Sequence, residues 1–338
     1  MDITADTLLA IPLDAPSRVF PQDPTEAAHV WRSLARQWHP DRTSDPRAEA
    51  VFAHLNALRK RASDWRSEGR WEANNTLILR GTDGKTRRLR YLKRHATDLG
   101  ETLIARTIFT SLTRVTHADL AERERRVIAN LTFANAKMEQ EMHLWLPSEI
   151  ARFETPAHHA LVLTKAPDMV LLADLLAHHG GTLDARHVGW IVSGMLHVAC
   201  YLEWAGLAHH AIGPETWLVS PEQHSGALLG GWAFATDIGT RLRAAPARTV
   251  NAAPSIWKTT KIATGAMDRE LIKLTGREMG HDMPDALTDW LTRPPMARAI
   301  DDYREWKNAL RDAFGRPRFV KLTTTPDTVY GDAQPKET

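Results

Sequence analysis

The sequence predicts an α+β fold, with an all-α N-terminal region followed by a larger region that begins with strands and ends with helices. Two observations lead to this prediction. Between residues 24 and 58, apolar side chains recur at three- and four-residue steps, which is typical of helices. From Thr76 onward, short apolar runs flank an Asp83-Gly84 turn, which is typical of a β-hairpin, and helical spacing returns after Asp184.

Composition limits the classes of protein to which the chain can belong. Its 338 residues leave room for two or three domains, and an apolar content of 43% is ordinary for a protein with real cores. Lysine and arginine (43) nearly balance aspartate and glutamate (41), so no overall field predicts binding to nucleic acid or acidic membranes. The basic segment 85–94 alternates with Leu89 and Leu92, which favours a half-exposed strand over a nucleic-acid patch.

The cellular compartment follows from cysteine usage and apolar runs. Cys200 is the only cysteine, which excludes a disulfide within the chain and fits a reducing compartment. The first residues lack a basic segment followed by a continuous apolar run, and no segment reaches the roughly 18 apolar residues of a membrane helix. We therefore expect a cytoplasmic protein without membrane or nucleic-acid partners.

Two helices with a short break between them are predicted in the N-terminal region. The first runs from Pro24 and has an apolar face of Ala27, Val30, Trp31, Leu34 and Trp38. Pro40 ends it, because proline lacks an N–H group and disfavours the helical conformation of the preceding residue. Asp45 and Pro46 supply an N-cap and a first-turn proline for the second helix, whose apolar face is Val51, Phe52, Leu55 and Leu58. The loop is short, so the two helices must pack antiparallel.

The loop between these helices begins with His39-Pro40-Asp41. Basic side chains surround it, namely those of His29, Arg32, Arg36 and Arg42. One interpretation is that His39 and Asp41 only cap a turn. The tripeptide is a weak signal by itself, but its position between two antiparallel amphipathic helices makes it a strong one. With the basic helix before it and Phe52, Leu55 and Asn56 after it, the segment 1–70 resembles a J domain of DnaJ-type co-chaperones.

This resemblance implies a protein partner. J domains dock their basic helix and their His-Pro-Asp loop onto a DnaK-type chaperone of the heat-shock protein 70 family and trigger its ATP hydrolysis. In this chain, Arg32 and Arg36 would steer the domain toward an acidic surface, and Asp41 would meet a cationic or amide group. The resemblance also places His39, Pro40 and Arg42 of the loop in the partner contact. The resemblance thus assigns partner binding, and no catalysis, to this loop.

The second region begins with strands. After the hairpin, residues 98–105 predict a turn followed by a strand, and residues 121–137 predict a charged helix. A buried strand at Leu161 leads to a short helix at residues 171–178. The clearest helix of the chain is capped by Asp184 and ends at Gly206.

The segment after this helix reads GLAHHAIGPETWLVSPEQHSGALLGGW. Its order of long helix, loop, short hairpin and glycine turn resembles the catalytic core of protein kinases. The resemblance implies a small lobe over residues 71–160 and a large lobe over residues 161–322. It also identifies Leu99–Ala105 with a degenerate glycine-rich loop and Asp268 with the buried aspartate of a large-lobe helix.

The residues that perform kinase chemistry are missing from the matching positions. Ala211 follows His209-His210 where the catalytic base stands, and alanine cannot accept a proton. Thr216 and Gly230 occupy the positions of the two magnesium ligands, and Gly100 is all that remains of the glycine-rich loop. Residues 95–130 contain no lysine, so only Arg114 could stand in for the phosphate-pairing lysine. We expect a pseudokinase-like body with no enzymatic activity and no cofactor.

The histidines, the tryptophans and the C-terminal segment allow more than one interpretation. The histidine pairs at 158–159, 178–179 and 209–210 could suggest a metal site, but no zinc-type spacing accompanies them, although His210 could still act as a general base in unrelated chemistry. The twelve tryptophans fit core packing better than a base or sugar platform. The polar segment 323–338 predicts a disordered tail.

The sequence therefore predicts a co-chaperone that recruits and stimulates a DnaK-type ATPase, while its kinase-like body binds an unknown client or scaffold. An atypical kinase or nucleotide-binding switch with a targeting J domain is the alternative from the enzyme class. A protein in which both domains serve only assembly is a third possibility.

Overall fold

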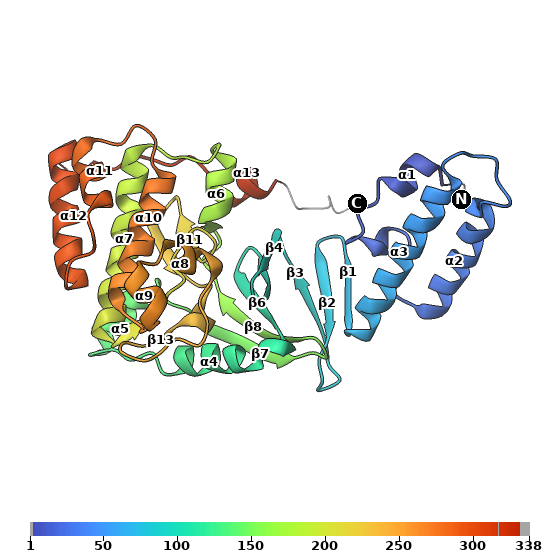
Figure 1. Cartoon of the computed structure of the whole chain (residues 1–338), viewed down its shortest axis with the longest axis horizontal. Helices are drawn as coiled ribbons and strands as arrows, with labels where there is room; N and C mark the ends of the chain where they lie inside the picture. The colour runs from blue at the N-terminus through green and yellow to red at the C-terminus, as the bar shows by residue number, and fades with distance from the viewer. Residues whose placement is uncertain (1–2, 317, 332–338) are drawn as a thin grey trace. The chain divides into compact units, whose positions relative to one another are not determined.

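The computed structural model describes residues 3–316 and 318–331, and it confirms a mixed α+β fold (Figure 1). The chain divides into two compact units. The first comprises Met1–Tyr91 and Phe153–His159, and the second comprises Leu92–Arg152 and Ala160–Thr338. The boundary expected from the sequence, at residue 70, precedes this division by the three strands that lie between residues 70 and 90.

The first unit contains helices followed by a three-stranded antiparallel sheet. Its elements are α1 (Ala5–Leu9), η1 (Pro16–Arg18), α2 (Pro24–Trp38), α3 (Ala48–Ser67), β1 (Arg70–Ala73), β2 (Thr76–Arg80) and β3 (Thr86–Arg90). The Asp23 carboxylate accepts hydrogen bonds from the N–H groups of Thr25 and Glu26, both at 2.9 Å, which fixes the start of α2. The predicted limits of α2 and the β2–β3 hairpin are confirmed, with Gly84 at a φ of 77° in the turn.

The start of α3 differs from the prediction. The helix begins at Ala48, so Asp45 and Pro46 lie outside it. The Asp45 carboxylate accepts the N–H of Arg47 at 2.9 Å and also pairs with its guanidinium, and these bonds hold a turn before the helix. Asp45 therefore does hold the local backbone, as predicted, but it stabilises the turn before α3 and does not form the N-cap of the helix.

One hydrophobic core joins the helices and the sheet of the first unit. Its buried members are Ala5, Leu8, Ile11, Phe20, Ala27, Leu34, Trp38, Val51, Leu55, Leu58, Ala62, Trp65 and Trp71. The indoles of Trp65 in α3 and Trp71 in β1 meet edge to face, with ring centroids 5.9 Å apart. This contact explains why the sheet folds with the helices and why the first unit continues to Tyr91.

Most residues of a five-stranded sheet lie at the start of the second unit, and those within Phe153–His159 belong to the first unit. The strands of this sheet are β4 (Lys93–Thr97), β5 (Gly100–Ile104), β6 (Ile108–Arg114), β7 (Glu149–Glu154) and β8 (His158–Thr164), in the order β4-β5-β6-β8-β7. Between β6 and β7 lie η2 (Val115–His117), α4 (Ala118–Ala129) and α5 (Ala136–Met142). The single helix predicted over residues 121–137 is therefore wrong. At the end of α4, the side-chain amide of Asn130 donates a hydrogen bond to the carbonyl oxygen of Arg126 at 2.7 Å. The Asn135 side chain then forms the N-cap of α5.

The rest of the second unit is mainly helical. Its elements are β9 (Val170–Leu171), α6 (Leu172–His178), α7 (Ala185–Trp204), β10 (Leu207–Ala208), β11 (Trp217–Ser220), β12 (Ser225–Leu228), η3 (Trp232–Phe234), β13 (Thr236–Asp237), α8 (Ala247–Ala252), α9 (Ser255–Thr260), α10 (Gly265–Met279), α11 (Asp285–Thr292), α12 (Ala299–Phe314) and α13 (Pro326–Tyr330). Helix α7 packs against both α10 and α12 (Figure 1). The Asp184 side chain accepts the N–H of Arg186 at 2.8 Å, which confirms the predicted cap of α7.

The expectation of a disordered tail is wrong for the described part of residues 323–338. Helix α13 begins with a reciprocal capping box between Thr325 and Thr328. The Tyr330 hydroxyl accepts the N–H of Leu171 at 3.0 Å, and Asp327 pairs with Arg106. Residues 332–338 lie outside the described part of the chain.

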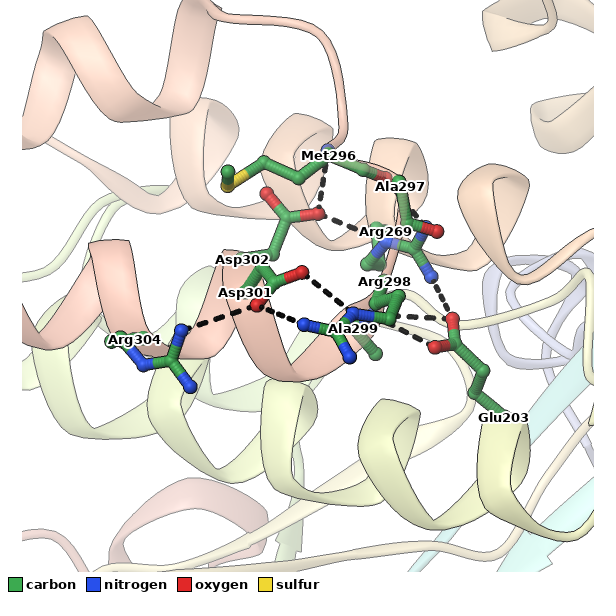
Figure 2. A network of polar contacts seen from close by, with 9 residues as sticks. All are labelled: Glu203, Arg269, Met296, Ala297, Arg298, Ala299, Asp301, Asp302 and Arg304. Atoms are coloured by element: carbon green, nitrogen blue, oxygen red, sulfur yellow. Dashed lines mark hydrogen bonds and ion pairs between the residues drawn. The ribbon is translucent and has the colours of Figure 1, made fainter.

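A buried ionic cluster ties three helices of the second unit together (Figure 2). Arg269 of α10 is 2% exposed, and its guanidinium contacts the carboxylates of Asp302 at 2.9 Å and Glu203 at 2.6 Å. Lys273, one turn further along α10, lies 3.4 Å from the other oxygen of Asp302. The Asp302 carboxylate also accepts the N–H of Met296 at 2.9 Å. These bonds satisfy charges that would be costly if buried alone.

Candidate functional site

The loop that follows α2 is organised by His39. Its carbonyl oxygen accepts the N–H of Arg42 at 2.8 Å, and its Nδ1 accepts the N–H of Asp41 at 3.2 Å. The imidazole meets the ring of Phe52 edge to face, with centroids 5.4 Å apart. His39 therefore does cap a turn, as the simpler interpretation of the sequence proposed, and it also anchors that turn to α3.

Asp41 has a different environment from His39. Its side chain is 87% exposed, and one of its carboxylate oxygens lies 3.6 Å from the His39 Nδ1. Pro40 is exposed beside it. The carboxylate of Asp41 is not used to cap the turn, so it is free to meet a partner.

Arginines flank this loop. Arg32 and Arg36 are exposed on α2, and Arg42 is exposed in the loop. The Arg32 Nε donates to the carbonyl of Ala28 in its own helix at 3.2 Å. Within the described residues, Arg36 and Arg42 form no ion pair or hydrogen bond through their side chains. The guanidinium groups therefore remain available to an acidic surface.

A stack of rings behind the loop was missed by sequence reasoning. Trp31 and Phe52 were assigned to buried faces, but both are half-buried, and their ring centroids lie 5.7 Å apart. The guanidinium of Arg59 lies 4.7 Å above the Trp31 ring. The signal for this stack is that Phe52 stands directly beside Val51 in the sequence, so one of the two must turn away from the centre of the core.

In the second unit, the loop at residues 209–216 is held by a buried carboxylate. The Asp268 oxygens accept the N–H groups of His209 at 2.7 Å and His210 at 2.6 Å. Burial raises the pKa of Asp268, while His210 and these two N–H groups act in the opposite direction. Asp268 thus fixes the backbone of this loop, in which His210 adopts a φ of 60°.

Neither histidine of this loop is placed to act as a base. Both side chains are completely buried, and burial lowers the pKa of His209 to about 3. The His209 ring packs edge to face against Trp232, with centroids 4.9 Å apart. The residue that follows, Ala211, contributes only a methyl group to the cavity described below.

The other positions assigned from the kinase resemblance serve local packing. The Thr216 hydroxyl donates to the carbonyl of Ala211 at 2.6 Å and accepts the N–H of Gly213 at 3.1 Å. A Cβ atom at Gly230 would lie 3.2 Å from the Thr216 Cα, and one at Gly100 would lie 2.0 Å from the carbonyl oxygen of Leu112. Both glycines therefore permit close backbone approach.

Arg114, the only candidate to stand in for a phosphate-pairing lysine, is the last residue of β6. It is exposed at the end of β6, and its Nη1 donates to the carbonyl of Asp98 at 3.3 Å. It does not line the cavity described next.

A cavity of about 270 Å³ lies between the β4–β5 hairpin, α4, α8 and the loop at residues 209–216. Its charged lining residues are Asp98, Glu124, Glu215 and Arg248. The guanidinium of Arg248 is engaged by both carboxylate oxygens of Glu278, at 2.9 and 2.6 Å. The charge that remains available in this cavity is therefore negative, which suits a cation better than a phosphate.

Glu124 is the buried carboxyl of this cavity, and its importance was also missed from the sequence. It is 5% exposed and follows Leu120 and precedes Ile128 on the buried face of α4. Burial raises its pKa to about 7. The signal that could have found it is the spacing, because Leu120, Glu124 and Ile128 are four residues apart and share one face of the helix.

Comparison with known proteins places the chain in no family. A scan against family models gave no match, and a search of curated proteins gave no significant relative. Among the described residues, no cluster of three or more histidine, cysteine, aspartate or glutamate side chains could hold a metal ion. No helix within the same part of the chain is long and apolar enough to cross a membrane.

Proposed function

We propose that this protein is a co-chaperone whose first unit acts as a J domain and stimulates the ATPase of a DnaK-type chaperone. The observation that carries the proposal is the loop at residues 39–41. It stands between two antiparallel helices, is anchored by His39, and presents the exposed carboxylate of Asp41. The exposed arginines 32, 36 and 42 lie in the same part of the unit.

The chemistry of this surface fits recognition of an acidic partner that also offers one cationic group. Exposed arginines accelerate encounter with an acidic surface through long-range attraction. Once docked, the Asp41 carboxylate would pair with a cation or an amide in a partly desolvated contact, where a charge-assisted hydrogen bond is strongest. His39 acts as a positioning residue, since it fixes the turn that carries Asp41.

For the second unit, we propose a kinase-like body without phosphotransfer activity, which binds a client or scaffold. The order of its elements supports this assignment: three consecutive antiparallel strands, helix α4, a further hairpin, the long helix α7 and then the loop fixed by Asp268. Loss of activity follows from Ala211, Thr216 and Gly230, which offer no base and no free metal ligand. We take Leu92 as the start of this body, because β1–β3 fold with the helices of the first unit.

The proposal is tested by the steady-state ATPase of a purified DnaK-type chaperone, measured with increasing amounts of the full chain. We expect stimulation by the wild-type protein, a decrease of this stimulation as salt is added, and its loss in His39→Gln. His281→Gln, in which a 71% exposed histidine of the second unit receives the same substitution, should stimulate like the wild type. Equal stimulation by His39→Gln and the wild type would refute the proposal.

The competing function is a nucleotide-binding switch, and a thermal shift separates it from the co-chaperone. A ligand that binds only the folded state raises the stability by RT ln(1 + [L]/Kd). The acidic lining of the cavity and the engagement of Arg248 by Glu278 argue against triphosphate binding. We expect no shift with ATP and Mg²⁺, and a clear shift would favour the switch.

A further inference from the structure

Glu124 is a buried carboxyl group that has no hydrogen-bonding or ion-pair partner within the described part of the chain. No hydrogen bond or ion pair joins its side chain to another of the described residues. Arg152 on β7 acts on Glu124 electrostatically and lowers its pKa, but the Arg152 guanidinium is itself held by the Glu149 carboxylate at 2.5 and 3.2 Å. Buried polar groups in folded proteins nearly always have partners, so this carboxyl calls for an explanation.

The cavity beside Glu124 has the lining of a site for a positive charge. Hydroxyl groups from the sheet, those of Thr102, Ser111 and Thr113, line it together with Glu124. Two further carboxylates, Asp98 and Glu215, are exposed members of the same lining. Acidic groups thus extend from solvent to the buried carboxyl, an arrangement that attracts cations and repels anions.

Apolar groups complete the lining. Ala211, Ala233 and Phe234 are all buried and contribute their side chains to the cavity. A pocket that combines apolar walls with a few convergent polar groups is typical of sites for small organic molecules. A bare metal ion fits less well, because among the described residues no group of three or more histidine, cysteine, aspartate or glutamate side chains is gathered closely enough to hold one.

We propose that this cavity binds a small organic cation, in which a protonated amine or an amidinium group forms an ion pair with Glu124. The hydroxyls of Ser111 and the two threonines would accept the remaining N–H groups, and the apolar body of the ligand would contact Phe234. The proposal concerns only the second unit, and it stands independently of the function proposed for the first.

The pH dependence of binding follows from the groups that face Glu124. These are Arg152 and Glu149 on β7, Asp98 in the β4–β5 turn, Glu215 in the loop, and Arg248 on α8. Burial dominates over the charges and raises the pKa of Glu124 to about 7. An amine needs the ionised carboxylate, so affinity should fall about tenfold for each pH unit below this pKa, and about a hundredfold between pH 8 and pH 5.

The test uses the full chain and benzylamine as the probe, with neutral benzyl alcohol as its counterpart, in isothermal titration calorimetry. We expect benzylamine to bind the wild type at pH about 8 and to bind Glu124→Gln at least about tenfold more weakly. Glu122→Gln changes an exposed glutamate of the same helix and should bind like the wild type. Benzyl alcohol should bind neither form.

Three outcomes would overturn the proposal. These are no detectable binding of benzylamine at millimolar concentration, equal binding by Glu124→Gln, and equal binding of benzyl alcohol. Glu124→Gln removes a buried titrating group without changing its size, so it should fold. Its melting temperature, measured in parallel at each pH, distinguishes lost binding from lost structure.

Discussion

Replacement of Glu124 by glutamine should make the second unit less sensitive to alkaline pH. Burial raises the pKa of Glu124 in the folded protein to about 7, from the 4.5 of an ordinary glutamate side chain. A carboxyl with a raised pKa favours the folded state fully below the unfolded value, and this contribution is lost as the pH rises through 7. Glutamine does not ionise, so Glu124→Gln should retain its stability over this range.

The size of this effect follows from the shift in pKa. A difference of roughly 2.5 units corresponds to about 3 kcal/mol of unfolding free energy, given about 1.4 kcal/mol for each unit. For a unit of this size, that amount moves the melting temperature by roughly 5 to 10 °C. Compared with the wild type, Glu124→Gln should therefore gain several degrees between pH 5 and pH 8.

Differential scanning calorimetry of the full chain across this pH range measures the effect. The quantity to compare is the difference in melting temperature between mutant and wild type at each pH, because other titrating groups then cancel. Glu122→Gln serves as the control and should follow the wild-type profile. A difference that stays constant from pH 5 to pH 8 would show that Glu124 is ionised, or already paired, in the folded protein.

Three further substitutions, one of them a control, test the fold and the loop. Asp302→Asn should destabilise the protein by about 3 to 5 kcal/mol, because it leaves the buried charges of Arg269 and Lys273 without their carboxylate partner. The control, Arg304→Gln on the exposed side of α12, should lower the unfolding free energy by less than about 1 kcal/mol. Chemical denaturation measures both effects. Phe52→Leu should lower ATPase stimulation up to about fivefold without unfolding, since the edge contact with the His39 ring is worth roughly 1 kcal/mol. Similar denaturation midpoints for the two α12 variants, or unchanged stimulation by Phe52→Leu, would contradict these expectations.

Much of the fold followed from local patterns in the sequence. The helix that ends at Trp38 and the β2–β3 hairpin were predicted because proline, aspartate and glycine act on the residues next to them. The cap at Asp184 was predictable for the same reason. Signals of this kind need no knowledge of the rest of the chain.

What the sequence missed depends on contacts between distant residues. The first unit extends to Tyr91 because the Trp65 and Trp71 rings join α3 to β1. The spacing of apolar residues within either element does not predict a contact between the two elements. Likewise, residues 326–330 are too polar to predict a core, but Tyr330 reaches the backbone of Leu171.

The candidate site divides in the same way. The exposed loop at residues 39–41 could be found from sequence, because its three residues are adjacent and stand between two helices with recognisable apolar faces. The cavity beside Glu124 could not, since its lining comes from a hairpin, a helix and a loop that lie far apart in the chain. The anchoring of His39 by Phe52 likewise required the packing of α2 against α3.

Single-turnover ATP hydrolysis by a DnaK-type chaperone, with ATP already bound, tests the central claim most directly. The full chain should accelerate this hydrolysis, and Asp41→Asn should abolish the acceleration, because it removes the exposed charge while leaving the turn held by His39 in place. Acceleration by Asp41→Asn equal to that by the wild type, or no acceleration by either protein, would contradict the account.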